Sequence, residues 1–101
     1  MNITKTQNGE TTILTIEGRL DSNTSDTLAA KFAKLFENGA NAIVLDFASL
    51  VYLSSAGLRV LLAAQKKLIA TGGSMLIKNC SEFIYDIFET TGFTNIMQIE
   101  S

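Results

Sequence analysis

A short, uninterrupted apolar segment in the middle of the chain, Ala42-Ile43-Val44-Leu45, is the strongest indication of the fold. Runs of this kind are typical of strands that are covered on both faces, as in parallel sheets. On either side of it, apolar residues recur at helical spacing, over a segment that ends near Asn38 and again from Ser55 or Ala56 to about Ala70. A buried strand between two amphipathic helices predicts an α/β fold.

The remaining segments extend this pattern on both sides. Residues 2–7 and 10–17 flank Asn8-Gly9, a dipeptide that favours a tight hairpin turn, so we expect an antiparallel hairpin to open the fold. After the third strand and second helix we expect a strand over 74–78, a helix over 81–90 and a short strand over 95–99. The whole is predicted to form one mixed sheet, with helices following alternating strands. The residues expected to face the core are Leu28, Phe32, Leu35 and Phe36 in the first helix, Leu58, Leu61, Leu62, Leu68 and Ile69 in the second, and Phe83, Ile84, Ile87 and Phe88 in the third.

Composition limits the number of domains and the class of partner. With 101 residues, 47% of them hydrophobic and 18% charged, the chain can fill one compact core, and we expect a single domain over 1–101. A formal net charge of −2 argues against a nucleic-acid partner. No apolar segment resembles a signal peptide or is long enough to span a bilayer, so we expect a cytoplasmic protein without direct membrane insertion.

The residue types that most enzymes use are scarce. Histidine is absent, which removes the usual general base and the commonest metal ligand, and Cys80 is the one cysteine. The ten acidic residues are scattered and form no recognisable pair or metal motif, and no Gly-rich phosphate loop is present. We therefore expect no catalytic residue, no metal site and no cofactor, and we interpret the chain as a non-enzyme.

The most informative window is residues 45–62, which joins the end of the buried strand to a helix. Open α/β sheets usually place their ligand or partner sites at such carboxyl ends of strands. At the helix start the first N–H groups lack intrahelical partners, so a phosphate there would be stabilised. We expect an exposed Ser55 hydroxyl to be open to a kinase, with Ala56 adding little bulk and Gly57 allowing close approach to the backbone.

A structural interpretation of the same turn remains open. Serine is among the best helix-capping residues, so Ser54 and Ser55 could simply cap the helix while Gly57 eases packing. Similarly, Asp46 is expected to anchor the loop, and Arg59, four residues after Ser55, lies on a helix face that is either part of a docking surface or merely solvated.

This window, together with the order of the predicted elements, resembles the STAS domains of bacterial anti-sigma factor antagonists. The similarity extends along almost the whole chain and is most specific over residues 46–62. In that family a serine or threonine in this turn, before a Gly-Leu pair, is phosphorylated by an anti-sigma factor that is also a serine kinase. The resemblance implies that Ser55 is the acceptor, with Ser54 the second candidate.

The resemblance also implies a partner switch. The unmodified domain would bind the anti-sigma factor and free a sigma factor, phosphorylation would end binding, and a serine phosphatase would reset the domain. Family members often carry aspartate before the acceptor, where this chain has Ser54, which can replace the aspartate as a cap but not as a charge. We expect the partner to contact residues around the turn, namely Asp21, Ser54, Ala56, Gly57, Leu58 and Arg59. Among these, Asp21 is a loop carboxylate that could equally serve only to start a turn.

Two other functions remain possible. One is a STAS subunit that is never phosphorylated and has a structural or regulatory place in a lipid-transport or stress-signalling complex. The other is a small-molecule or nucleotide-binding domain, which would require a sizeable pocket.

Overall fold

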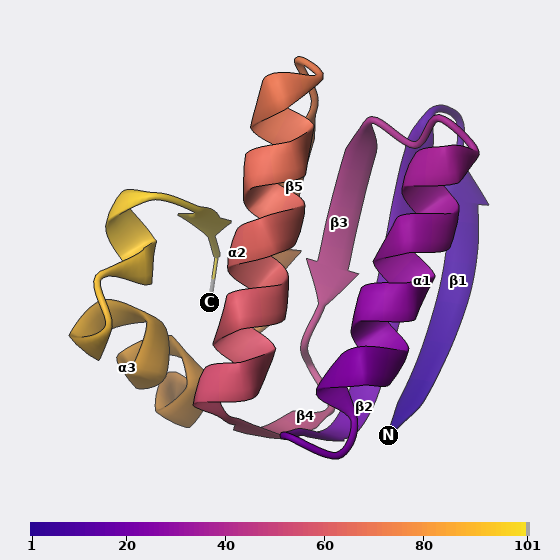
Figure 1. Ribbon diagram of the computed structural model, residues 1–101. Coiled ribbons are helices and arrows are strands. Elements are labelled where there is room, and N and C mark those ends of the chain that lie inside the picture. Colours follow the sequence, from indigo (N-terminus) through magenta and orange to yellow (C-terminus); the bar gives the residue numbers. More distant parts are fainter. Residues whose placement is uncertain (101) are drawn as a thin grey trace.

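The computed structural model describes residues 1–100 as a twisted sheet with helices packed against it (Figure 1). The elements confirm the predicted α/β class and the mixed sheet that an antiparallel hairpin opens. In chain order they are β1 (Asn2–Asn8), β2 (Thr11–Leu20), α1 (Ser25–Glu37), β3 (Ala42–Asp46), β4 (Leu50–Leu53), α2 (Ser55–Ala70), β5 (Ser74–Lys78), α3 (Glu82–Thr90), the 3-10 turn η1 (Phe93–Asn95) and β6 (Gln98–Ile99).

Strand β2 is shared between two neighbours, and this determines where the loops meet. The strand order is β1-β2-β3-β5-β6, with β1 antiparallel to β2 and the other pairs parallel. The first half of β2 pairs with β3, and its last residues, Gly18–Leu20, pair with β4 after a register shift between Gly18 and Arg19. Gly18 has φ +97°, a conformation that glycine adopts without strain, and such a bulge bends the strand. The carboxyl ends of β2 and β4 are therefore side by side.

Strand β4 was not predicted, and the second strand was predicted to end at residue 17. Both errors have one cause. Residues 50–53 form only four residues of strand, and the partner that makes them a strand is the part of β2 beyond the glycine bulge. A glycine within a strand pattern is easily taken for its end.

The hairpin turn lies one residue later than predicted. Asn8 is the last residue of β1 and pairs with Thr11, so the two-residue loop is Gly9-Glu10 rather than Asn8-Gly9. Gly9 has φ +64°, whereas Glu10 does not have a positive φ, as in the type II′ turns that place glycine first. In this register Ile3 lies opposite the fully buried Ile16.

The core is built from the sheet and all three helices: α1 and α2 run side by side (Figure 1), and α3 adds the fully buried Ile84 and Phe88. Strand β3 is central, as predicted, but it is fully buried on one face only. Ile43 and Leu45 are buried, whereas Val44 between them is partly exposed. The uninterrupted apolar run therefore overstated how completely the strand is covered.

Two predicted core residues are on the surface, and the last strand is shorter than predicted. Ile69 is 63% exposed because the buried stripe of α2 passes through its neighbour Leu68. Phe83 is 57% exposed because α3 presents Ile84 and Phe88 to the core, and one residue along a helix is a turn of about 100°. Residues 95–97 form the end of η1 and a turn, leaving only Gln98–Ile99 as strand.

Candidate functional site

The candidate site lies at the carboxyl edge of the sheet, where β2 and β4 end and α2 begins. Leu20 and Leu53 are paired in the last rung, and the Ser54 N–H donates to the Leu20 carbonyl at 2.9 Å. This bond connects the loop after β2 to the first residue of the α2 turn. Asp21 and the two serines are therefore brought to the same end of the molecule, as the family resemblance implied.

The structure gives the two serines different tasks. Ser54 is the N-cap of α2, with extended backbone angles, and its Oγ accepts a hydrogen bond from the Gly57 N–H at 3.2 Å. Ser55 is the first residue of the helix, its side chain is exposed, and it makes no side-chain hydrogen bond within residues 1–100. The capping interpretation is thus correct for Ser54, while the Ser55 hydroxyl is available to a second molecule.

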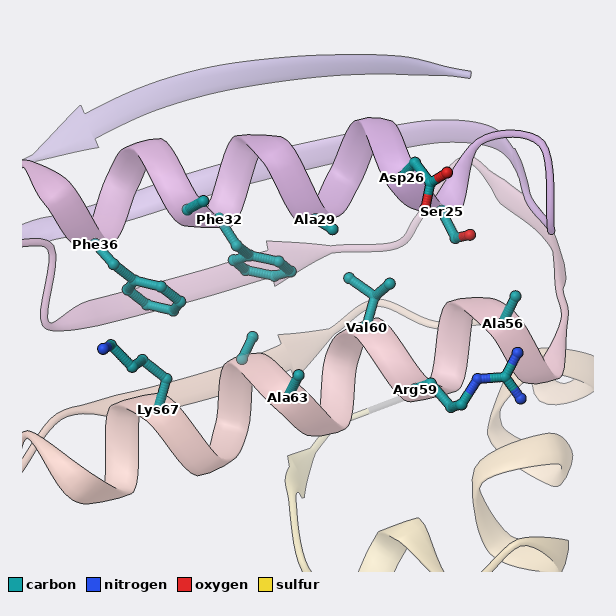
Figure 2. A pocket seen from close by; sticks show the side chains of 12 residues that line it. Ser25, Asp26, Ala29, Phe32, Phe36, Ala56, Arg59, Val60, Ala63 and Lys67 are labelled. Atoms are coloured by element: carbon teal, nitrogen blue, oxygen red, sulfur yellow. The ribbon is translucent and has the colours of Figure 1, made fainter.

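The start of α2 favours an added negative charge. The N–H groups of Ser55 and Ala56 lie in the first turn, where no intrahelical acceptor exists, and the first turn contains no acidic residue. Arg59 follows one turn later, and its guanidinium extends back toward Ala56 (Figure 2). No carboxylate lies within 4.0 Å of Arg59 in the described part of the chain. A phosphate on Ser55 would therefore meet free N–H groups, the helix dipole and an unpaired cation.

Gly57 and Leu58 face inward. A Cβ on Gly57 would lie 2.7 Å from Leu20 Cγ and 3.0 Å from Leu53 Cδ1, and Leu58 is only 7% exposed. The missing side chain at position 57 lets α2 pack closely on β2 and β4, so the open backbone that the sequence suggested here is absent. Both residues support the turn from beneath, whereas Ser55 and Arg59 are exposed.

Asp21 organises the loop between β2 and α1. Its Oδ1 accepts hydrogen bonds from the N–H groups of Asn23 at 2.9 Å and Thr24 at 3.1 Å, and the Arg19 Nε lies 3.6 Å from its Oδ2. The bond from the Asn23 N–H, with help from Thr24 and Arg19, lowers the pKa of the Asp21 carboxyl below 3.8. This is the turn-starting role that the sequence left as the alternative.

The neighbouring loops are held by similar contacts. Asp46 Oδ1 accepts from the Ala48 N–H at 3.0 Å and from the Asn79 side-chain amide at 3.2 Å, so Asp46 anchors the loop as predicted. Cys80 is buried, and its burial raises the pKa of the thiol. In the described residues, no group of three or more His, Cys, Asp or Glu side chains is placed to bind a metal ion. Similarly, none of the helices from Ser25 to Asn95 is both long and apolar enough to cross a membrane.

A groove beside this site was not predicted. It runs between α1 and α2, has a volume of about 440 Å³ and ends next to the serine turn (Figure 2). The side chains that line its rims, Ala29 and Ala33 on α1 and Ala56 and Ala63 on α2, are too small to fill the space between the helices. Small residues at spacings of four and seven in two adjacent helices were the available signal in the sequence.

The sequence is similar to that of a known domain family and of proteins from two bacteria. The family described as STAS domain matches residues 2–101. BtrV of Bordetella bronchiseptica strain RB50, a candidate anti-sigma factor antagonist, is 32% identical over 87 residues, which are 86% of this chain and 75% of BtrV. The anti-sigma-B factor antagonist of Bacillus subtilis strain 168 is 29% identical over all of this chain and 92% of its own length.

Solved structures share the fold. The anti-sigma factor antagonist SpoIIAA in its unphosphorylated form matches with a TM-score of 0.80 and 20% identity, over 99% of this chain and 88% of that chain. The phosphorylated form of the Bacillus protein SpoIIAA matches with a TM-score of 0.77 and 22% identity, over 99% and 92% of the two chains.

Proposed function

Because this chain belongs to the STAS domain family, we propose that it acts as an anti-sigma factor antagonist controlled by phosphorylation of Ser55. In this proposal the unmodified protein binds an anti-sigma factor that is also a serine kinase, and so releases a sigma factor. Phosphate on Ser55 ends that binding, and a serine phosphatase restores it. The names of the two curated relatives and the solved phosphorylated form of SpoIIAA support this function.

One observation carries the choice of acceptor: Ser54 uses its hydroxyl to cap α2, whereas the Ser55 hydroxyl is exposed and unbonded within residues 1–100. A kinase must align the acceptor oxygen with its nucleotide, so a hydroxyl already engaged in the protein is the poorer substrate. Ser55 also lies where the helix dipole stabilises the product. These two properties favour Ser55 over Ser54.

Charge is sufficient to explain release of the partner. A phosphoserine carries about −1.5 to −2 charges at neutral pH. Leaving such a group unpaired in an interface costs several kcal/mol, and each 1.4 kcal/mol or so is tenfold in affinity. Because Ser55 is on the surface at the start of a helix, the modification can change binding without disturbing the core.

The test is phosphorylation by the purified cognate anti-sigma factor kinase with ATP, followed by localisation of the phosphate by mass spectrometry. We expect one phosphate on Ser55 in the wild type and in Ser54→Ala, the matched control, and none in Ser55→Ala. Phosphate on Ser54, or equal modification of Ser55→Ala, would refute the assignment.

A binding titration with the same anti-sigma factor completes the test. We expect Ser55→Ala to bind like the unmodified wild type and Ser55→Asp to bind at least about tenfold more weakly. Equal affinities of the two variants would instead fit a STAS subunit with a fixed partner, as in a lipid-transport or stress-signalling complex.

A further inference from the structure

The groove between α1 and α2 has an apolar floor and walls. Phe32 and Phe36 of α1 and Val60 of α2 point into it, and the alanines of both helices widen it (Figure 2). Phe32 is almost fully buried beneath the groove, whereas Ala33 and Ala63 on its rims are exposed. The groove is therefore an apolar channel at the surface that part of another molecule can enter.

Two cations lie along the α2 side of this channel. Arg59 and Lys67 line it eight residues apart, which is roughly 12 Å along a helix. Neither has a carboxylate within 4.0 Å in the part of the chain that the structure describes, and Asp26 is the one acidic residue of the lining. In a protein whose formal charge is −2, this excess of positive charge at an apolar groove is complementary to an acidic, apolar ligand.

We propose that this groove receives an amphipathic helix of the anti-sigma factor, with apolar residues in the channel and carboxylates against Arg59 and Lys67; this rests on the proposed function. An amphipathic helix laid into a hydrophobic groove is a recurring mode of recognition, and its apolar face repeats every three to four residues. Two carboxylates about two turns apart on its flank match the spacing of the two cations.

The groove is connected to the switch through Arg59. Ser55 and Arg59 are four residues apart, so they are neighbours on one face of α2. A phosphate on Ser55 competes for the Arg59 guanidinium, which already extends toward the start of the helix (Figure 2). Phosphorylation thus removes one of the two cations from the helix in the groove, in addition to repelling the partner's carboxylates directly.

Charge reversal on α2 tests the contact with the purified cognate anti-sigma factor as the probe. Lys67→Glu places a negative charge in the groove, and Lys66→Glu makes the same change at an exposed position that does not line it. On α1, Ala33→Glu enters the groove, and Ala30→Glu is its exposed control outside it. Circular dichroism melts of all four variants show whether each is folded.

We expect Lys67→Glu and Ala33→Glu each to weaken binding about tenfold or more, while both controls stay within about twofold of the wild type. In both control variants, phosphorylation of Ser55 should still prevent binding. If the groove variants and their controls bind alike while Ser55→Asp still weakens binding, the groove inference is wrong and the proposed function stands. If Lys67→Glu alters self-association in sedimentation and leaves anti-sigma factor binding unchanged, the groove is instead an interface between copies of this chain, and the inference is wrong.

Discussion

Individual side chains decide whether the turn before α2 is a cap or a site, and here adjacent serines divide the two roles. Ser54 accepts the Gly57 N–H, while Ser55 has an exposed side chain that is unbonded in residues 1–100. The sequence could show that one of them would cap the helix, because serine at a helix start is a strong signal. It could not show which one, because the choice depends on backbone angles that the last rung of β4 imposes.

The division of roles predicts that alanine variants of the two serines differ in stability. Ser54→Ala removes the cap, so we expect it to lower the free energy of unfolding by about 1 kcal/mol. Ser55→Ala removes no hydrogen bond and should change that free energy by less than about 0.5 kcal/mol. Urea unfolding monitored by circular dichroism measures both. Equal losses in the two variants would contradict the assignment of Ser54 as the cap.

Asp21 predicts a pH dependence. Hydrogen bonds from Asn23 and Thr24 favour the charged carboxylate and lower its folded-state pKa below 3.8. The stabilisation is therefore fully present above about pH 4 and is lost as the pH falls through the lowered folded-state pKa. We expect Asp21→Ala to melt at a lower temperature than the wild type at pH 7.

Melting temperatures measured from pH 7 down to pH 2 test this. The gap between Asp21→Ala and the wild type should narrow only below about pH 4, where the wild-type carboxyl becomes protonated. Glu17→Gln, an exposed carboxyl on β2, is the control and should follow the wild type. A gap that stays constant down to pH 2 would mean that the carboxylate charge is not what stabilises the loop.

Helices and strands were predicted well where their own periodicity defines them. Strand β3 and helices α2 and α3 lie within a residue or two of their predicted bounds, and α1 ends one residue before the predicted Asn38, because a continuous apolar run or a helical stripe identifies each. Strand β4 escaped prediction because only its pairing with β2 beyond the Gly18 bulge makes it a strand. Within helices, prediction was wrong for Ile69 and Phe83, which are exposed. An apolar residue one position away from the buried stripe points out of the core.

The packing of α2 on the sheet gives a prediction whose sign is diagnostic. At an exposed helix position, replacing glycine by alanine stabilises a protein by up to about 1 kcal/mol. At Gly57 the new Cβ would lie 2.7 Å from Leu20 Cγ, so we expect Gly57→Ala to destabilise by about 1–3 kcal/mol.

A double-mutant cycle isolates the contact. In a Leu20→Ala background the contacts with Leu20 are gone and only Leu53 Cδ1, at 3.0 Å, stays close, so Gly57→Ala should destabilise clearly less than it does in the wild type, as measured by urea unfolding. A loss of the same size in both backgrounds would show that the clash with Leu20 is not the cause.

The molecule as a whole gathers the polar residues of its loops at one edge of the sheet. The strands β2, β3, β4 and β5 run in parallel, so their carboxyl ends place Asp21, Asp46, Ser54 and Asn79 at the same end of the fold, below a core that none of these side chains enters. The topology that gathers these loops was predictable from the alternation of strands and helices. The groove beside them was not, because it depends on how far apart two helices lie, which the alanines reveal only once both helices are placed.

This separation of core from edge predicts that a negative charge at position 55 changes binding without refolding the domain. A negative charge at position 55 lies in the first turn of α2, where the helix dipole favours it, so Ser55→Asp should raise the free energy of unfolding by about 0.5 kcal/mol. The gain should shrink in 1 M salt, because exposed charges are screened. The same variant should bind the anti-sigma factor more weakly, so stability and affinity move in opposite directions.

Urea unfolding at two salt concentrations, with Ser55→Asn as the neutral control, measures the change in the free energy of unfolding. Amide NMR spectra show whether chemical shifts change beyond the start of α2. A loss of more than about 1 kcal/mol, or shifts throughout β3 and β5, would mean that the charge acts by disturbing the core and not by repelling a partner at the surface.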